Sequence, residues 1–218
     1  MVAAKSLVAA ALACLTCTAA ALADAPTIRI TKTDQAKATA ALLHRSDVGV
    51  GWAGGAVKPS PLTPPTCPGF DPKESDLTVT GHADARFTFA AAGVELDQDV
   101  QVLKSAKAVL TDFRRTISPK LAGCLQHQLA GLSNVSAASV SRVTFPPTGA
   151  VSAVYRAMID VKHGKQTGRL ISDYVFFGEG RFEYEFTIVA PVGTRSQLAR
   201  FESGLAAILL KRAGAVSA

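Results

Sequence analysis

The cysteines of this chain are the residues whose chemistry is easiest to name from the sequence alone. Cys67 lies in a proline-rich segment and Cys124 in a helical pattern, while Cys14 and Cys17 fall in an apolar N-terminal run. Neither Cys67 nor Cys124 has a histidine at zinc-ligand spacing. Because a lone cysteine pair in an exported chain typically forms a disulfide, we expect a Cys67–Cys124 bond. Closing a loop of about 57 residues would constrain the unfolded chain by roughly 4 kcal/mol.

Other groups that often carry catalysis stand apart along the sequence. The histidines are His44, His82, His127 and His163, and none has a second histidine at helical ligand spacing. There is no nucleophile-elbow serine and no phosphate-cradling glycine loop. The carboxylates at 183 and 185 share one strand face, a pattern that ordinary strand surfaces also show. We therefore expect no catalytic residue, no metal ion and no cofactor.

A row of charged residues is the best candidate for a ligand site. Arg156, Asp173 and Glu185 fall on one face if the strands pair as described below. One interpretation is a set of cross-strand ion pairs, each contributing about 0.2–1 kcal/mol. The other is the floor of a polar groove in which Arg156 anchors an anionic ligand. We favour ion pairs, because opposite charges that satisfy each other leave no free group. Trp52 among glycines is either a loop anchor, the commoner case, or a ligand platform.

Three alternating segments would position that row. Residues 151–162, 169–177 and 182–190 each alternate polar with apolar side chains, which indicates antiparallel strands. A two-residue turn at Gly164–Lys165 pairs Arg156 with Asp173, Tyr155 with Tyr174 and Asp160 with Arg169. For the second turn, a two-residue loop at 179–180 would place Phe182, Tyr184, Phe186 and Ile188 on the face of Arg156, and a three-residue loop at 178–180 would place them with Tyr155. We choose the three-residue loop, because it gathers the aromatic residues on one face.

The first half of the chain supplies a hairpin, helices and a long loop. Residues 83–102 alternate around a turn at Ala92–Gly93, and pairing Ala91 with Val94 sets Arg86 opposite Asp99. Thr33 or Asp34 should cap a helix, and further helices should follow Ser105, start at Ser118–Pro119 and cover 196–211. A short edge strand is expected at 27–31 and another strand at 140–145. Residues 51–73 are rich in glycine and proline and are expected to be an irregular loop.

The N-terminus has the pattern of an export signal. Lys5 is followed by an apolar run and by the A-x-A site Ala21-Leu22-Ala23, which predicts that residues 1–23 are removed. Lipid attachment at Cys14 or Cys17 is the alternative, and it is disfavoured because the residues three positions before them do not fit. Nothing later approaches about 20 consecutive apolar residues, so residues 24–218 are expected to form a single secreted domain without a transmembrane segment.

Charge argues against one class of partner. The formal net charge of +6 is spread along the chain without a basic face that also carries interleaved aromatic residues. We therefore expect no nucleic-acid partner.

The order of these features resembles a known family. Leu42-Leu43 and Ser46-Asp47-Val48-Gly49 precede the loop with Cys67, and residues 100–105, Phe113, Cys124, three strands and a helix follow. This is similar to the extracytoplasmic sensor domain of PknH-type actinobacterial serine/threonine kinases and of related exported proteins and lipoproteins. The family usually has a second disulfide and a tryptophan before its helical cysteine, where this chain has Leu121-Ala122-Gly123.

The resemblance implies a fold and a class of function. The fold would be α+β, with an antiparallel sheet of five to six strands and helices packed on it in a PsbP-like or sensor-domain-like sandwich. The function would be non-catalytic binding of an unknown small molecule or cell-envelope component in a disulfide-braced cleft. The alternative is an envelope enzyme acting on a polymer or lipid. We expect a ligand site between the charged sheet face and the 51–73 loop.

Overall fold

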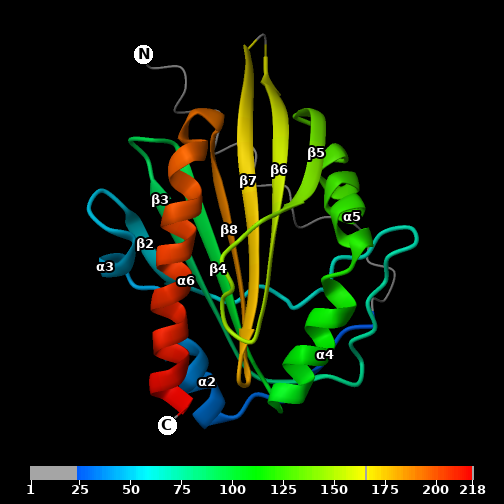
Figure 1. The fold of residues 1–218 in the computed structure, drawn as a ribbon, viewed down its shortest axis with the longest axis vertical. Coiled ribbons are helices and arrows are strands. Elements are labelled where there is room, and N and C mark those ends of the chain that lie inside the picture. The colour runs from blue at the N-terminus through cyan, green and yellow to red at the C-terminus, as the bar shows by residue number, and fades with distance from the viewer. Residues whose placement is uncertain (1–23, 165, 218) are drawn as a thin grey trace.

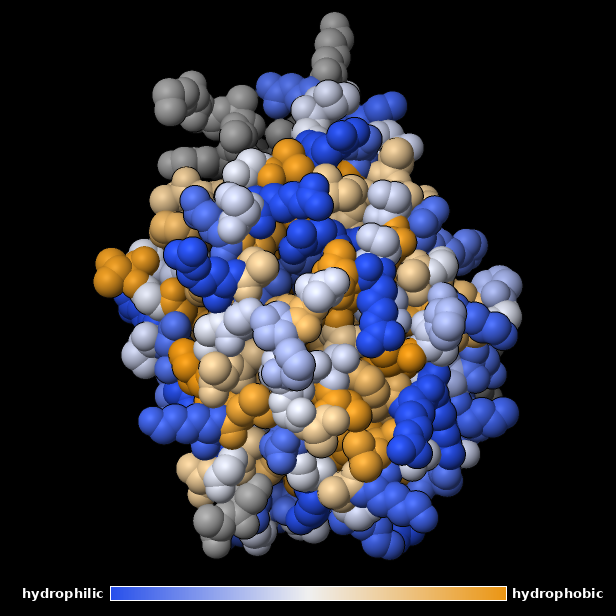
Figure 2. Space-filling model, viewed as in Figure 1, coloured by the Kyte–Doolittle hydropathy of each residue, from blue (hydrophilic) through white to orange (hydrophobic). Residues whose placement is uncertain are grey.

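The computed structural model describes residues 24–164 and 166–217. The expected export signal, with Cys14 and Cys17, lies outside these residues, as does Lys165 of the expected turn. Within the described residues no helix combines the length and the apolar character needed to cross a bilayer. On the face shown in Figure 2, hydrophobic and hydrophilic residues are intermingled.

An eight-stranded mixed sheet is the centre of the molecule (Figure 1). Its strand order is β1-β3-β4-β8-β7-β6-β5, and β2 pairs with the outer side of β3. The α+β class is therefore confirmed, whereas the sheet is larger than expected and the pairing of β1 with β3 is parallel. The strands are β1 (Thr27–Ile28), β2 (Ala53–Val57), β3 (Thr78–Phe89), β4 (Val94–Leu103), β5 (Val135–Val143), β6 (Val151–His163), β7 (Gln166–Glu179) and β8 (Phe182–Pro191).

Helices cover both faces of this sheet. In Figure 1 α6 crosses in front of the sheet, and α4 and α5 lie on the side of β5 and β6. Ser105 caps α4 as expected, and its hydroxyl accepts a hydrogen bond from Ala108 N. The cap of α2 is Thr31 and not Thr33 or Asp34, because the Thr31 hydroxyl accepts from Asp34 N. The helices are α2 (Lys32–Ala40), α3 (Arg45–Val48), α4 (Ala106–Thr116), α5 (Pro119–Ala130) and α6 (Arg195–Ser217), with a 3₁₀ turn at Val192–Thr194.

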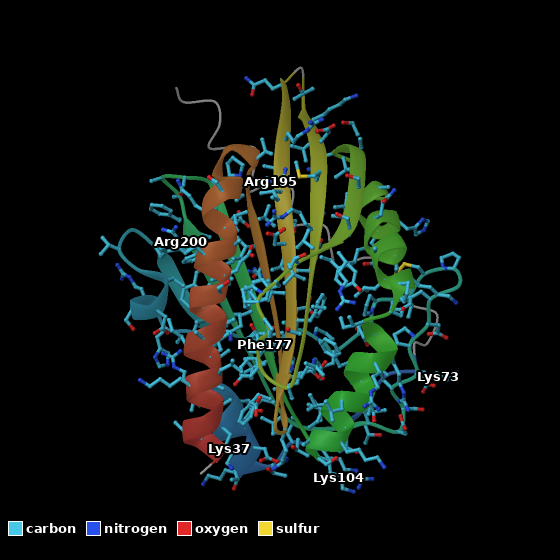
Figure 3. The ribbon with its side chains drawn as sticks, in the orientation of Figure 1. Lys37, Lys73, Lys104, Phe177, Arg195 and Arg200 are labelled. Atoms are coloured by element: carbon cyan, nitrogen blue, oxygen red, sulfur yellow. A yellow bond between two sulfur atoms is a disulfide. The ribbon has the colours of Figure 1, made fainter. Side chains whose placement is uncertain are left out.

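The larger core lies between the sheet and the pair α2 and α6. Aromatic residues of β7 and β8 fill its middle, and Phe177 stacks on Tyr184 with ring centroids 4.7 Å apart. Phe177 lies at the centre of the sheet in Figure 3. Leu205 and Leu209 of α6 belong to the same core and cover these rings on the helix side. Burial of this apolar surface is the main force that holds α6 on the sheet.

The opposite face carries two smaller cores under α4 and α5. Leu121 and Leu125 of α5 pack on Tyr155 of β6, which donates a hydrogen bond to Ser118 O. The expected disulfide is confirmed: Cys67 and Cys124 are bonded, with Cα atoms 5.4 Å apart. The disulfide joins the long loop to α5 at this core.

The β6–β7 register is as the sequence predicts, and the β7–β8 register is not. Arg156 pairs with Asp173 and Asp160 with Arg169. The second turn is Gly180–Arg181, because residues 178 and 179 belong to the ladder, where Gly178 pairs with Glu183. Relative to the expected three-residue loop, every side chain of β8 changes face.

A distant contact explains this turn. Arg181 donates to Leu103 O and forms an ion pair with Asp34 of α2 at 2.6 Å. Gly180 takes the positive φ of 56° that the turn requires. The turn is thereby fastened to the end of β4 and to α2, and the aromatic residues of β8 face the large core.

Two further expectations for the first half need correction. The β3–β4 hairpin is shifted by two residues, so Arg86 pairs with Asp97 and not Asp99. A shift of two keeps every side chain on its face. The loop at 51–73 is not wholly irregular, because β2 pairs along β3 and Cys67 and Phe70 form a short hydrogen-bonded turn.

Candidate functional site

The expected row of charged residues is divided between the two faces of the sheet. Arg156 and Asp173 lie on the α6 side, where they form a bidentate ion pair. The Asp173 side chain is 0% exposed, and Glu202 of α6 lies against it. Glu185 lies on the other face, because of the β7–β8 register. The Arg156 guanidinium is thus occupied by its ion pair with Asp173, and its expected role as an anion anchor stays a prediction.

Trp52 is a structural anchor in the described chain. Its ring is stacked between Phe89 and Phe201, with centroids 5.6 and 5.5 Å away. Its exposed fraction is 7%. The tryptophan therefore ties the start of β2 to α6, and its expected role as a ligand platform stays a prediction.

A cavity of about 290 Å³ lies between the sheet and residues 60–65, which we call the proline segment. The cavity adjoins the loop of the predicted ligand site, but it lies on the opposite sheet face from Arg156 and Asp173, and Glu185 is the one predicted site residue among its lining residues. Seven of the lining residues are acidic and one, Arg86, is basic. We call it the acidic cavity, and its carboxyl residues are Glu74, Asp84, Asp97, Asp99, Asp112, Glu183 and Glu185.

The floor of the acidic cavity is made by three neighbouring strands. Asp97 and Asp99 alternate with apolar residues of β4, so they point away from the large core. Asp99 pairs with Glu185 on β8 and with Asp84 on β3. Glu183 lies two residues from Glu185 on the same face, about 7 Å along the strand. Strand order therefore gathers carboxylates that are about 100 residues apart in the chain.

One end of the cavity floor holds an internally satisfied cluster. His82 Nε2 lies 2.5 Å from an Asp99 oxygen and 3.0 Å from an Asp84 oxygen. Burial opposes the charged imidazole, but the hydrogen bonds to Asp84 and Asp99 raise the pKa of His82 to about 9. The three side chains also meet the geometric requirement for holding a metal ion. With His82 protonated, however, they form a salt bridge that occupies the ligand atoms.

The other end of the floor has carboxyl groups pressed against one another. Burial and the neighbouring Asp112 raise the pKa of Glu183 well above its usual range. Burial likewise raises the pKa of Asp112, whose carboxylate accepts a hydrogen bond from Thr116. Glu183 Oε2 is shielded from solvent and has no hydrogen-bond donor in the described part of the chain. Like charges this close favour retention of a proton, so this pair can supply an acid or receive a cation.

Glu74 and Glu185 are two further cavity carboxyl groups without a hydrogen-bond donor among the described residues. Burial, followed by the charge of Asp112, raises the pKa of Glu74 to about 8, and burial with Asp99 raises that of Glu185 to about 8. Glu74 is 7% exposed, and neither carboxylate receives a hydrogen bond from a described residue.

The nearby cationic side chains have other partners. Arg86 pairs with Asp97, and Arg115 of α4 makes a bidentate pair with Asp76. Neither is bonded to Glu74, Glu183 or Glu185. Four carboxyl groups of the cavity, counting Asp112, therefore have no ion-pair partner among the described residues.

The wall opposite the floor is held in place at several points. Ser60 N donates to Asp84 at 2.8 Å, and Cys67 further along the loop is bonded to Cys124. Lys73, near α4 in Figure 3, accepts a hydrogen bond from Arg115 through its carbonyl. The wall itself is partly apolar, because prolines and Leu62 face the cavity. Carbon and carboxylate surfaces thus lie across from each other.

The sequence contained part of this site. His82 and Asp84 alternate on β3, and Asp97 and Asp99 alternate on β4, so the polar face of the hairpin was visible. The expectation that no metal ion binds considered only histidine spacing, and it stays a prediction. Asp112 and Glu74 could not be assigned to the site, because only packing of α4 and of the loop end brings them to β8.

Comparisons with known proteins assign no family to the chain. No protein-family model matches it, and no curated protein matches it.

Proposed function

We propose that this protein is a non-catalytic ligand-binding or sensor-like module of the bacterial cell envelope. Its ligand site would be the acidic cavity beneath the proline segment. The observation that carries the proposal is a cavity in which four of the lining carboxyl groups have no ion-pair partner among the described residues, an arrangement that costs folding energy. The disulfide fits an extracytoplasmic location. The resemblance to kinase sensor domains implies ligand binding as well.

A ligand screen by NMR tests this proposal. The purified, oxidised protein is mixed with a library of anionic, neutral and cationic metabolites, and backbone amide shifts are recorded. We expect at least one compound to shift amides of the proline segment and of residues 183–187, without shifting those around Arg156. If no compound affects the cavity, or binders shift only residues elsewhere, the proposal fails.

A second function is favoured by one specific observation. Glu183 and Asp112 form a buried carboxyl pair with raised pKa values, and such a pair can supply a general acid at neutral pH. This supports the alternative of an envelope enzyme acting on a polymer or lipid. The same NMR samples distinguish the two, because an enzyme would convert a bound compound to product over hours. Binding without conversion supports the non-catalytic function.

A further inference from the structure

The charge balance of the acidic cavity indicates what kind of ligand would complete it. Glu74, Asp112, Glu183 and Glu185 line one cavity and form no ion pair among the described residues, although the charge of Arg115 acts on Glu74 and Asp112. Under α6 the carboxylate of Asp173 is paired with Arg156, and Asp34 is paired with Arg181. Buried charges in proteins are normally paired, so a bound cation would stabilise the ionised forms of the cavity carboxyl groups.

A second observation is independent of the number of acidic residues. Glu74 as a residue is 7% exposed and lines the cavity, and its carboxylate receives no hydrogen bond from any described residue. Glu183 Oε2 is likewise shielded and unbonded. An ionised carboxylate oxygen accepts hydrogen bonds and cannot donate them, so a ligand that binds the ionised forms of these groups must supply the donors.

The walls distinguish an organic cation from a metal ion. Pro61, Leu62 and Phe176 line the cavity beside the carboxylates, and an aliphatic skeleton would contact them. The backbone positions of residues 183 and 185 are about 7 Å apart along β8, a spacing that suits two separate ammonium groups. The histidine-containing cluster is the best metal candidate, and its atoms are bonded to each other.

We propose that the acidic cavity binds a small aliphatic diamine or polyamine. The inference rests on the proposed function, because it names the ligand class of the same site. The ammonium groups donate hydrogen bonds to Glu183, Glu185 and Glu74, and the carbon chain lies along the proline segment. The whole protein has a net charge of +6, so general attraction cannot account for binding of such a cation.

Binding should also release protons. Burial raises the pKa of Glu185 and of Glu74 to about 8, so both are largely protonated in the free protein at neutral pH. An ammonium ligand favours their ionised forms, and the displaced protons leave to solvent. Affinity for the ligand should therefore rise between pH 6 and pH 8.

Isothermal titration calorimetry of the purified, oxidised protein tests the inference. Spermidine is the probe, 1,8-octanediol is the neutral molecule of similar length, and Mg²⁺ and Zn²⁺ are the inorganic cations. We expect spermidine to bind one to one with proton release, seen as a dependence of the heat on buffer ionisation. We expect no binding of the diol and at least tenfold weaker binding of either metal ion.

Two variants locate the binding. The double substitution Glu183→Gln with Glu185→Gln should weaken spermidine binding at least tenfold, because two charge-assisted hydrogen bonds are lost. Glu95→Gln changes a carboxylate of β4 outside the cavity lining and should leave the affinity within twofold. Thermal melts establish that each variant folds.

The possible results separate this inference from the proposed function. Equal binding of the diol, tighter binding of Mg²⁺ or Zn²⁺, or unchanged spermidine affinity in the folded double variant would overturn the inference. An anionic or neutral library compound in the cavity, with no spermidine binding, overturns the inference and leaves the proposed function standing. Absence of any cavity ligand overturns both.

Discussion

Two groups of buried carboxylates lie on opposite faces of the same sheet, and their surroundings differ. Under α6, Asp173 is bonded to Arg156, and Glu202 lies beside it. Burial and the hydrogen bond with Asp173 raise the pKa of Glu202 to about 9, so Glu202 is neutral at pH 7. Under the proline segment, four carboxyl groups line a cavity, and Glu183 and Asp112 share a hydrogen bond, but none of the four has an arginine ion-pair partner among the described residues. The first group contributes to a packed core, and the second has unused hydrogen-bonding capacity at a cavity.

The two carboxylate groups also differ in what packs over them. α6 places Leu198, Leu205 and Leu209 on the sheet, so the α6 face is closed by a continuous apolar contact. The opposite face is closed at β5 and β6 by α4 and α5, and at β3 and β4 by a loop. A loop rich in proline has little core of its own and depends on its attachment points. We therefore expect the stability of the fold to reside mainly in the α6 face, and the proposed ligand site lies on the other face.

The largest effect is expected from breaking the packed group. Arg156→Ala leaves Asp173 buried without its cation, which should cost roughly 3–5 kcal/mol of unfolding free energy. Chemical denaturation monitored by circular dichroism measures the loss. Ligand binding in the acidic cavity should persist at temperatures where the variant is folded. A loss below about 1 kcal/mol together with abolished binding would contradict the comparison and restore Arg156 as a ligand anchor.

Removing the disulfide tests the cover of the cavity. Cys67→Ala combined with Cys124→Ala frees a loop with a sequence separation of 57, and the entropy model gives a loss of about 4 kcal/mol. Denaturant melts of the variant and the oxidised parent measure it. Hydrogen exchange should accelerate mainly in the proline segment and α5, and much less in α6. Equal acceleration across both faces would show that the two covers are not independent.

The smallest effect on the free energy of unfolding is expected from substitution of a cavity carboxyl group. Such a substitution should stabilise the protein, whereas the two changes above destabilise it. A carboxyl group whose pKa is raised on folding binds more protons in the folded state, so the stability of the protein falls as pH rises. For Glu74 and Glu185 this window runs from 4.5 to about 8. His82 adds to the same trend, because stability from its protonated form is lost as pH rises from 6.5 through about 9.

Glu183 is another cavity carboxyl group whose pKa is raised by burial, and Glu183→Gln removes it. At pH 8 it should stabilise the protein on the order of 1 kcal/mol, and at pH 4 it should have little effect. Thermal melts across this pH range measure the change, with Glu179→Gln outside the cavity lining as the control. Destabilisation at pH 8 comparable to that of Arg156→Ala would mean that Glu183 is a satisfied structural residue.

Local rules account for much of the fold. The hydroxyl of Ser105 at the start of α4 and the proline after Ser118 at the start of α5 act on neighbouring backbone groups, so the sequence predicted both helices. The β6–β7 register followed from a short turn. Residues of β2 were expected in a loop, because the sequence Ala-Gly-Gly-Ala-Val has a weak strand pattern and forms a strand only by pairing with β3.

The sequence by itself determined which residues alternate along β3, β4, β6, β7 and β8, where α4 and α5 begin and which two cysteines join. These follow from contacts within a few residues or from a lone pair of thiols. Only the tertiary structure decided which face of β8 meets the large core, because Arg181 in the turn is held by Asp34, 147 residues away. A register change by an even number preserves faces, as in β3–β4, whereas an odd change exchanges them. Because of that exchange, Glu183 and Glu185 lie in the acidic cavity and not on the sheet face of Arg156, where the sequence predicted them.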